Sequence, residues 1–224
     1  RAQSGSAKTA AVGLVMTDTI TEPGMQALVL APTRALVVQL TRDLNALAKD
    51  APFRAVAVYG GVPYDGQIAA MQDPDTTCIV ATTGRLLDLM ARKQAVLDKV
   101  RFVVLDEADR MLDLGFLPEV ERVLKAIPGG RQTALFTATM PKKIQQLAHR
   151  YMSHPRDLEV GDTTPESADH LRIDVASTNM FEGLLALLEH ERPTRTLIFT
   201  RTRDGAQILA RRLVEAGVMA TPLH

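Results

Sequence analysis

Three carboxylates within four positions, Asp106, Glu107 and Asp109, directly follow a mostly apolar run over residues 100–105. A short apolar run that ends in acids is typical of a buried parallel strand whose carboxyl end meets solvent. Ligands of open α/β sheets bind at that edge, and carboxylates there suit a hard cation such as Mg²⁺ held together with substrate phosphates. An acidic helix start is the alternative, because the helix dipole favours acids there. The tetrapeptide alone does not decide between the two.

A loop of small residues precedes the first predicted helix and ends in Lys8-Thr9. This is the shape of a phosphate-binding loop, in which backbone N–H groups face phosphate, the Lys reaches the terminal phosphates and the Thr hydroxyl can ligate Mg²⁺. The usual pattern has Gly at two positions that Ala2 and Ala7 occupy here. A plain turn before a helix is the alternative interpretation.

Five buried strands are predicted to position these groups, and a helix-length segment follows each of them. The strands span residues 26–31, 54–59, 77–81, 100–105 and 132–138. This alternation predicts an α/β fold with a mainly parallel, doubly wound sheet. Every strand ends on its carboxyl side in a cluster of Thr, Arg, Asp or Gly, which is how a ligand-binding edge would look.

The segment 161–170 is rich in turn formers and lacks periodicity, so we expect a linker there between a first domain, 1–160, and a second, 171–224. In the second, strands are expected over 171–176, 196–200 and from 218, with helices over 180–190 and 204–216. The pattern indicates that a further α/β domain begins here. Neither end of the chain has the form of a natural terminus, so we expect the chain to be a fragment.

Composition narrows the function classes. The 224 residues carry 26 Lys and Arg against 26 Asp and Glu, so any nucleic-acid surface must be a local patch rather than a global basic field. The single Cys78 excludes an internal disulfide and fits the cytoplasm or another reducing compartment, an organelle included. No apolar run approaches the roughly 18 residues of a membrane span, so no membrane partner is expected.

Taken together and in order, these motifs resemble those of the DEAD-box ATP-dependent RNA helicases, and the resemblance covers essentially the whole chain. It implies RecA-like P-loop NTPase domains that close over ATP and single-stranded RNA. The first would lack the N-terminal strand that feeds the phosphate loop, so its sheet would miss a central member, and the second would be incomplete. It also implies ATP and Mg²⁺ as cofactors, and ATP hydrolysis coupled to RNA duplex unwinding or RNA–protein remodelling.

The resemblance assigns the ATP site. It places Lys8 on the terminal phosphates, Thr9 and Asp106 on Mg²⁺, and Glu107 on the attacking water. Asp109 would couple these acids to a hydroxyl motif, Thr137-Ala138-Thr139, where the family usually has Ser-Ala-Thr. The phosphate loop would comprise Gln3, Ser4, Gly5, Ser6, Ala7, Lys8 and Thr9.

The resemblance also assigns RNA-binding loops, which would grip the sugar–phosphate backbone. Arg and Thr donors and exposed loop N–H groups suit phosphate and do not read bases. On their chemistry alone, Arg34 and Arg85 favour solvated helix starts over RNA contacts. The predicted RNA-binding residues are Pro32, Thr33, Arg34, Gly60, Gly61, Thr82, Gly84, Arg85 and, in the second domain, Phe199 and Arg201. Ribonucleoprotein or ribosome-assembly partners are compatible with this assignment.

Three positions depart from the family pattern. Ala35 stands where Glu is common, and Thr83 where Pro is common. Ala7 matters most, because a Gly before the phosphate-loop Lys lets the backbone approach phosphate and adopt torsions that a Cβ disfavours. The alternative function is therefore a weakly hydrolysing or inactive ATP- and RNA-binding clamp within a ribonucleoprotein.

Overall fold

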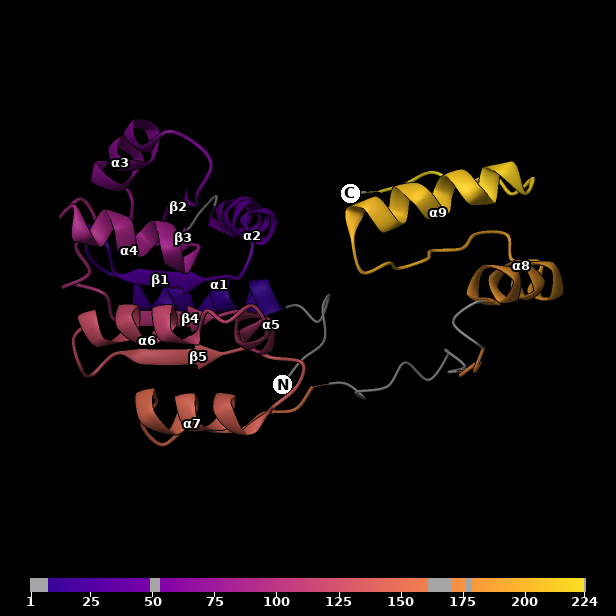
Figure 1. Ribbon diagram of the computed structural model, residues 1–224. Helices are drawn as coiled ribbons and strands as arrows, with labels where there is room; N and C mark the ends of the chain where they lie inside the picture. Colours follow the sequence, from indigo (N-terminus) through magenta and orange to yellow (C-terminus); the bar gives the residue numbers. More distant parts are fainter. Residues whose placement is uncertain (1–7, 49–52, 161–170, 176–178, 224) are drawn as a thin grey trace. The chain divides into compact units, whose positions relative to one another are not determined.

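The computed structural model describes residues 8–48, 53–160, 171–175 and 179–223 (Figure 1). The chain divides into two compact units, Arg1–Ser167 and Ala168–His224, and each is considered by itself. The predicted linker, 161–170, lies outside the described residues. Within the described part of the chain, no helix is both long and apolar enough to cross a membrane.

The first unit is built on a sheet of five parallel strands in the order β2-β3-β1-β4-β5. This confirms the predicted α/β fold with a parallel sheet. Each strand is shorter than its predicted segment because backbone pairing stops before the apolar run does. The sheet is continuous from β2 to β5, so the gap expected in its middle is not seen among the described residues. The strands are β1 (Ala27–Leu30), β2 (Ala55–Val58), β3 (Cys78–Ala81), β4 (Phe102–Leu105) and β5 (Gln132–Leu135).

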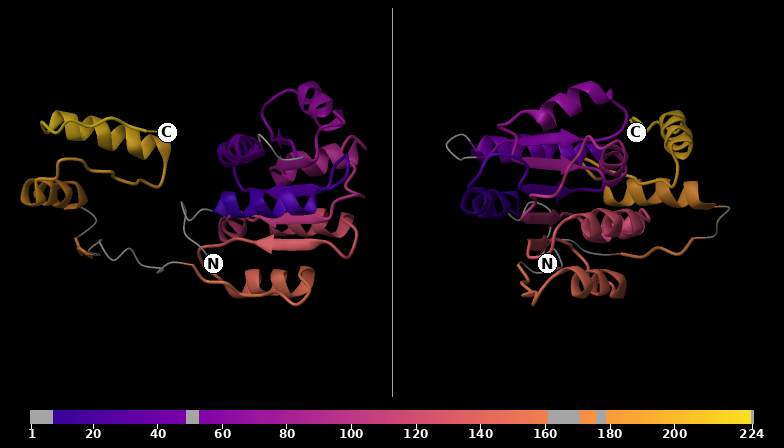
Figure 2. Two further views of the ribbon diagram at one scale, coloured as in Figure 1. Left: turned by 180° about the vertical axis from the view of Figure 1, so that it is seen from behind. Right: turned by 90° about the vertical axis from the view of Figure 1, so that its left-hand side faces the viewer.

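Helices cover both faces of the sheet, which explains why the strands read as unbroken apolar runs. Alternate strand residues pack in two separate cores. One core holds α1 (Lys8–Thr19) and α2 (Arg34–Leu47), and the left-hand view of Figure 2 shows α1 crossing that face. The other core holds the remaining helices: α3 (Tyr64–Gln72), α4 (Thr83–Ala91), α5 (Ala108–Asp113), α6 (Leu117–Ala126) and α7 (Lys142–Tyr151).

The parallel sheet brings the predicted site loops that follow its five strands to one edge, because all five strands end there. The strand order then divides that edge into two halves. The loops after β2, β3 and β1 lie side by side, and they carry the residues predicted to bind RNA. The loops after β4 and β5 are neighbours, and they carry the predicted catalytic acids and hydroxyls. The helices that follow the strands therefore begin at the same edge of the sheet, where the predicted site residues of these loops lie.

The second unit contains two helices within its described residues, α8 (Met180–Glu191) and α9 (Arg203–Glu215), as predicted. The strands predicted there are wrong. The described residues of 171–176, 196–200 and 218 onward form no strand, and Leu197 and Phe199 are 67% and 87% exposed instead of buried. A strand forms only with a hydrogen-bonded neighbour, and the described residues of this unit supply none.

Candidate functional site

Asp106 is buried at the carboxyl end of β4, with 6% of its surface exposed. Its backbone N–H donates to the Leu30 carbonyl at 2.9 Å and so joins the ends of β4 and β1. Its carboxylate Oδ1 accepts from the Glu107 N–H at 3.0 Å and lies 3.7 Å from the Lys8 ammonium. Burial raises the pKa of Asp106, although Lys8 and the Glu107 N–H oppose the shift. The structure thus places Lys8, at the start of α1, next to this acid.

Thr9 and Asp106 offer oxygen ligands of the kind that Mg²⁺ prefers. Both line one small cavity, together with Lys8 and Phe136. Among the described residues there is no group of three or more His, Cys, Asp and Glu side chains that could hold a metal ion. One carboxylate and one hydroxyl, completed by substrate phosphates, form a donor set that suits Mg²⁺. A cation would also stabilise the ionised form of Asp106, which burial disfavours.

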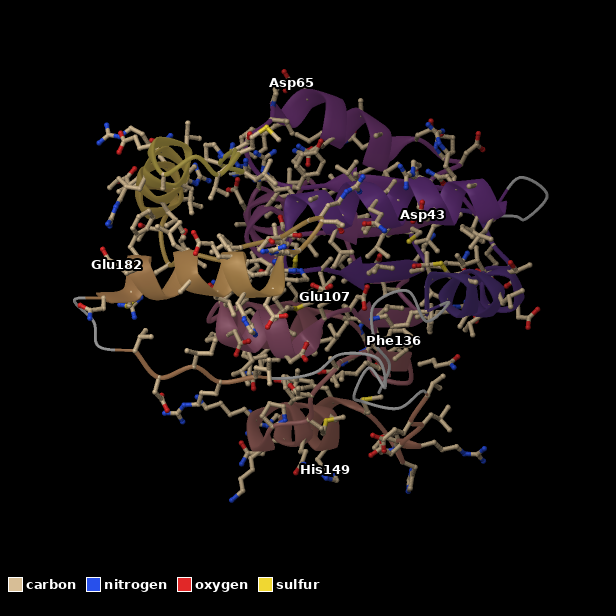
Figure 3. The ribbon with its side chains drawn as sticks, turned by 90° about the vertical axis from the view of Figure 1, so that its right-hand side faces the viewer. Asp43, Asp65, Glu107, Phe136, His149 and Glu182 are labelled. Atoms are coloured by element: carbon tan, nitrogen blue, oxygen red, sulfur yellow. The ribbon has the colours of Figure 1, made fainter. Side chains whose placement is uncertain are left out.

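Glu107 stands at the start of α5 in a left-handed backbone conformation, with φ at 51°. Non-glycine residues adopt this conformation rarely, and strained positions of this kind cluster at functional sites. The Glu107 carboxylate pairs with Arg110 at 3.3 Å. The next residue, Ala108, donates its N–H to the Phe136 carbonyl at 3.0 Å, so the segments around Glu107 and Phe136 are joined (Figure 3).

Asp109 joins the loop after β4 to the loop after β5. Its Oδ2 accepts from the backbone N–H groups of Ala138 and Thr139, at 3.1 and 2.9 Å, and from the Thr139 hydroxyl at 3.1 Å. Thr137 is buried, and its hydroxyl donates to the Thr139 carbonyl at 2.5 Å. Burial raises the pKa of Asp109, but the hydrogen bonds from Thr139, Arg110 and Thr137 together outweigh it and leave the pKa below its usual value. The structure therefore brings together the predicted acid and hydroxyl motif.

Replacing Asp109 with Asn should remove stability in a pH-dependent way. Because the folded pKa is lowered, the carboxylate stabilises the fold fully above the usual value of 3.8, and this is lost as the pH falls through the lower folded value. We expect Asp109→Asn to lower the free energy of unfolding at neutral pH, and the difference from wild type to shrink below about pH 4.

Urea unfolding of both proteins from neutral to acidic pH measures this difference. Asp113→Asn is the control, since Asp113 is an exposed acid at the end of the same helix. A difference between Asp109→Asn and wild type that stays constant with pH would rule out the stabilising role of the carboxylate.

In the other half of the edge, formed by the loops after β1, β2 and β3, Arg34 lies against the glycine pair, Gly60 and Gly61. A Cβ added to Gly61 would stand 2.1 Å from Arg34 Nη1, and one added to Gly60 would stand 3.7 Å from Nη2. Gly61 also has φ at 89°, a conformation that glycine adopts without strain. Thr33 caps α2, because its hydroxyl accepts from the Leu36 N–H at 3.2 Å. The loops after β1 and β2 thus meet at a backbone that only glycine permits.

Arg85 connects the loop after β3 to the same place. Its Nη2 donates to the Val62 carbonyl at 2.9 Å, and its guanidinium lies 4.1 Å from the ring centroid of Tyr64. Arg85 is therefore not a freely solvated residue at a helix start. Thr82 donates its N–H to the Val58 carbonyl at 3.0 Å, while Gly84 is exposed. All three predicted RNA-binding loops of the first unit are neighbours.

Two residues that the sequence motifs did not predict, Gln67 and Tyr64, shape the half of the edge formed by the loops after β1, β2 and β3. Gln67 is 8% exposed; its amide oxygen accepts from the Tyr59 N–H at 2.9 Å, and its Nε2 donates to the carbonyls of Tyr59 and Pro63, each at 3.2 Å. It holds both ends of the segment that contains the glycine pair. Tyr64 packs against Arg85. In the sequence, neither differs from a residue on an ordinary helix face.

The remaining predicted residues lie elsewhere. The part of the phosphate loop from Gln3 to Ala7 falls outside the described residues. In the second unit, Phe199 and Arg201 are exposed just before α9. Two other arginines of that unit make contacts within it: Arg212 lies 3.9 Å from the Phe181 ring centroid, and Arg211 pairs with Glu215 at 3.5 Å.

The parallel sheet and the lysine that faces a buried acid at its carboxyl edge define a RecA-like α/β domain. A family model described as DEAD/DEAH box helicase matches residues 1–147. The chain belongs to the DEAD/DEAH box helicase family, as the sequence motifs predicted.

Individual relatives agree with this membership. The DEAD-box ATP-dependent RNA helicase CshA of Bacillus subtilis is 36% identical over 228 residues, and the match covers 100% of this chain and 46% of that protein. The ATP-dependent RNA helicase DbpA of the same organism is 35% identical, with 100% and 47% covered. The crystal structure of a DEAD box protein from the hyperthermophile Methanococcus jannaschii matches with a TM-score of 0.69 and 31% identity, over 99% of this chain and 60% of that one. The chain spans about half the length of the curated relatives that it matches.

Proposed function

We propose that the protein is an ATP-dependent RNA helicase, which couples ATP binding and hydrolysis to RNA duplex unwinding or RNA–protein remodelling. The division of the sheet edge carries this proposal: the acid half, after β4 and β5, adjoins the glycine and arginine loops after β1, β2 and β3. The names of the relatives, which are ATP-dependent RNA helicases, support it.

In the acid half, the residues of this chain position the reacting groups. The Lys8 ammonium, 3.7 Å from Asp106, is placed to bind terminal phosphates. Thr9 and Asp106 would hold Mg²⁺, which supplies charge neutralisation between phosphates when bound. Glu107 would orient the attacking water from its fixed position at the start of α5. Positioning and electrostatic stabilisation of this kind account for most of the catalysis of phosphoryl transfer.

A backbone hydrogen bond joins the two halves of the edge, from the Asp106 N–H to the Leu30 carbonyl, and through it ATP binding would act on RNA binding. Asp109 holds the loop after β5, and the Asp106 N–H holds the end of β1 through Leu30. The chain reaches Thr33 and Arg34 three and four residues after Leu30. A shift of the acids on binding ATP would therefore be transmitted to the first RNA loop along one continuous path.

RNA is the proposed partner, held through its sugar–phosphate backbone and without sequence selectivity. Phe199 and Arg201 of the second unit would add contacts to the same class of ligand. This assignment treats 1–160 and 171–224 as parts of two RecA-like domains joined by a linker over 161–170. Ribonucleoprotein or ribosome-assembly partners fit this activity. The buried free thiol of Cys78 fits the cytoplasm or another reducing compartment.

RNA-stimulated ATP hydrolysis by the full-length protein tests the proposed function. We expect single-stranded RNA to raise the rate of hydrolysis, and DNA of the same sequence to raise it less. If RNA binds but hydrolysis stays at background, the protein acts as an ATP- and RNA-binding clamp. If DNA stimulates hydrolysis as well as RNA does, the substrate class is wrong.

Ala7→Gly is expected to raise the rate of hydrolysis. In this family, Gly commonly precedes the phosphate-loop lysine. If the residue at this position must adopt positive φ to bind phosphate, an Ala there costs about 1–2 kcal/mol, or about 5–30-fold in ATP affinity. Steady-state kinetics should show a lower KM for ATP or a higher kcat. Ala11→Gly, one helical turn further along α1, is the control and should give no gain. An unchanged rate for Ala7→Gly would sink the idea that Ala7 limits turnover.

A further inference from the structure

Tyr64, the first residue of α3, lies at the centre of a cluster of side chains from α4. The Arg85 guanidinium lies 4.1 Å from its ring centroid, and that of Arg92 lies 4.5 Å away. The Tyr64 hydroxyl donates to Asp88 Oδ2 at 2.5 Å, and Asp88 Oδ1 accepts from Arg92 Nε at 3.0 Å. Arg85 and Asp88 of α4 and Arg92, the residue that caps its C-terminus, are spaced for one face of a helix. Tyr64 therefore joins the start of α3 to one face of α4.

Arg85 is the member of this cluster whose position depends most on Tyr64. Its guanidinium makes one hydrogen bond, from Nη2 to the Val62 carbonyl, while Nη1 is buried without a hydrogen-bond partner among the described residues. An arginine normally has five N–H donors to fix its orientation. Here stacking on the Tyr64 ring supplies what the missing hydrogen bonds would otherwise provide.

The bond from Arg85 to Val62 bears directly on the glycine pair, because Val62 follows Gly61 in the chain. Gln67 holds the same segment from Tyr59 to Pro63, and Arg34 lies against Gly61. The backbone of half-buried Gly60 and exposed Gly61 is thus held at three points. Two of them, Gln67 and Arg34, do not involve Tyr64; the third, Arg85, does.

We propose that Tyr64 is a positioning residue for RNA binding: its ring holds Arg85 on the Val62 carbonyl and so fixes the Gly60–Gly61 backbone for a sugar–phosphate ligand. This inference rests on the proposed function. The contacts of the hydroxyl indicate that the aromatic ring is the part of Tyr64 that positions Arg85. The hydroxyl is occupied by Asp88, and the bond from Tyr64 to Asp88 and the charge of Arg92 hold the pKa of Asp88 below its usual value. The hydroxyl thus anchors the ring to α4, and the ring contacts Arg85.

The test compares Tyr64→Leu, which removes the aromatic ring, with Tyr64→Phe, which keeps the ring and loses the bond to Asp88. Single-stranded RNA is titrated into the full-length protein, and RNA-stimulated ATP hydrolysis is measured. We expect Tyr64→Leu to raise the KM for RNA about 5-fold, within the range for loss of one cation–π contact, with kcat and the KM for ATP unchanged. Tyr64→Phe should stay within about 2-fold of wild type.

A double-mutant cycle with Arg85→Gln separates this role from general stability. If Tyr64 acts through Arg85, Tyr64→Leu will have no further effect on the KM for RNA in the Arg85→Gln background. Additive effects, or an unchanged KM in Tyr64→Leu while wild type binds RNA, would overturn the inference and leave the proposed function standing. Absence of RNA binding by wild type would overturn the proposed function and the inference with it. Melting temperatures of all variants verify that each one folds.

Discussion

Asp106→Asn should abolish ATP hydrolysis and, at the same time, stabilise the nucleotide-free protein. The carboxylate is 6% exposed and would hold the catalytic cation, so its loss removes several kcal/mol of transition-state stabilisation, which corresponds to a rate lowered at least about 100-fold. Stability should change in the opposite direction, because burial raises the pKa of this acid in the folded state. The ionised carboxylate therefore costs stability as the pH rises above the usual carboxyl range.

Two measurements check this prediction. ATP hydrolysis with saturating RNA gives the loss of activity, and thermal unfolding without nucleotide at neutral and acidic pH gives the change in stability. We expect a higher Tm for Asp106→Asn at neutral pH, and a gain that disappears near about pH 3, where Asp106 is neutral in wild type as well. Asp18→Asn, at an exposed acid of α1, is the control. Activity within a factor of about two of wild type would remove Asp106 from the catalytic site.

Gly61→Ala should disrupt RNA binding and leave ATP binding intact. The added Cβ would lie 2.1 Å from Nη1 and 2.7 Å from Cζ of Arg34, so the guanidinium must move away from the loop. The backbone at φ 89° adds a cost of about 1–2 kcal/mol for any residue with a Cβ. Loss of the Arg34 position and of the loop conformation together should raise the Kd for RNA at least about 10-fold.

Fluorescence anisotropy with a labelled single-stranded RNA measures this change. Gly66→Ala is a matched control, because a Cβ at Gly66 meets nothing within 4 Å, and alanine is favoured within a helix. It should bind RNA as wild type does. If Gly61→Ala also binds RNA with wild-type affinity, the glycine pair and Arg34 do not form the RNA site.

The sequence predicted the first sheet well because its strands are self-evident apolar runs bounded by turn formers. The run that precedes Asp106 and the run that precedes Pro32 are buried on both faces of the sheet, and no helix pattern competes with them. The run at 196–200 also contains three consecutive apolar residues, yet Phe199 is 87% exposed there. Pairing decides whether such a run becomes a strand, and pairing depends on distant segments that local periodicity does not reveal.

The candidate site also contains contacts that the sequence predicts and contacts that depend on distant segments. Lys8 and Asp106, and Asp109 and Thr139, were predicted as groups because an ordered set of motifs names them, and the structure brings each pair together. The contact of Tyr64 with Arg85 carries no such signal. It depends on β2 lying beside β3, which places the start of α3 against α4, and strand order is not written in the spacing of residues. Contacts between neighbouring loops, such as that of Tyr64 with Arg85, are therefore visible in the structure but not predictable from the sequence.

In the proposed function, the two halves of one sheet edge form a coupled site for ATP and RNA. A linkage measurement tests this coupling: the Kd of the full-length protein for single-stranded RNA is measured with and without a non-hydrolysable ATP analogue and Mg²⁺, and the Kd for the analogue with and without RNA. We expect each ligand to tighten binding of the other by the same factor, within the roughly 5–150-fold typical of such coupling, and Asp109→Asn to reduce this factor. Equal RNA affinity with and without the analogue would show that the two halves are not coupled.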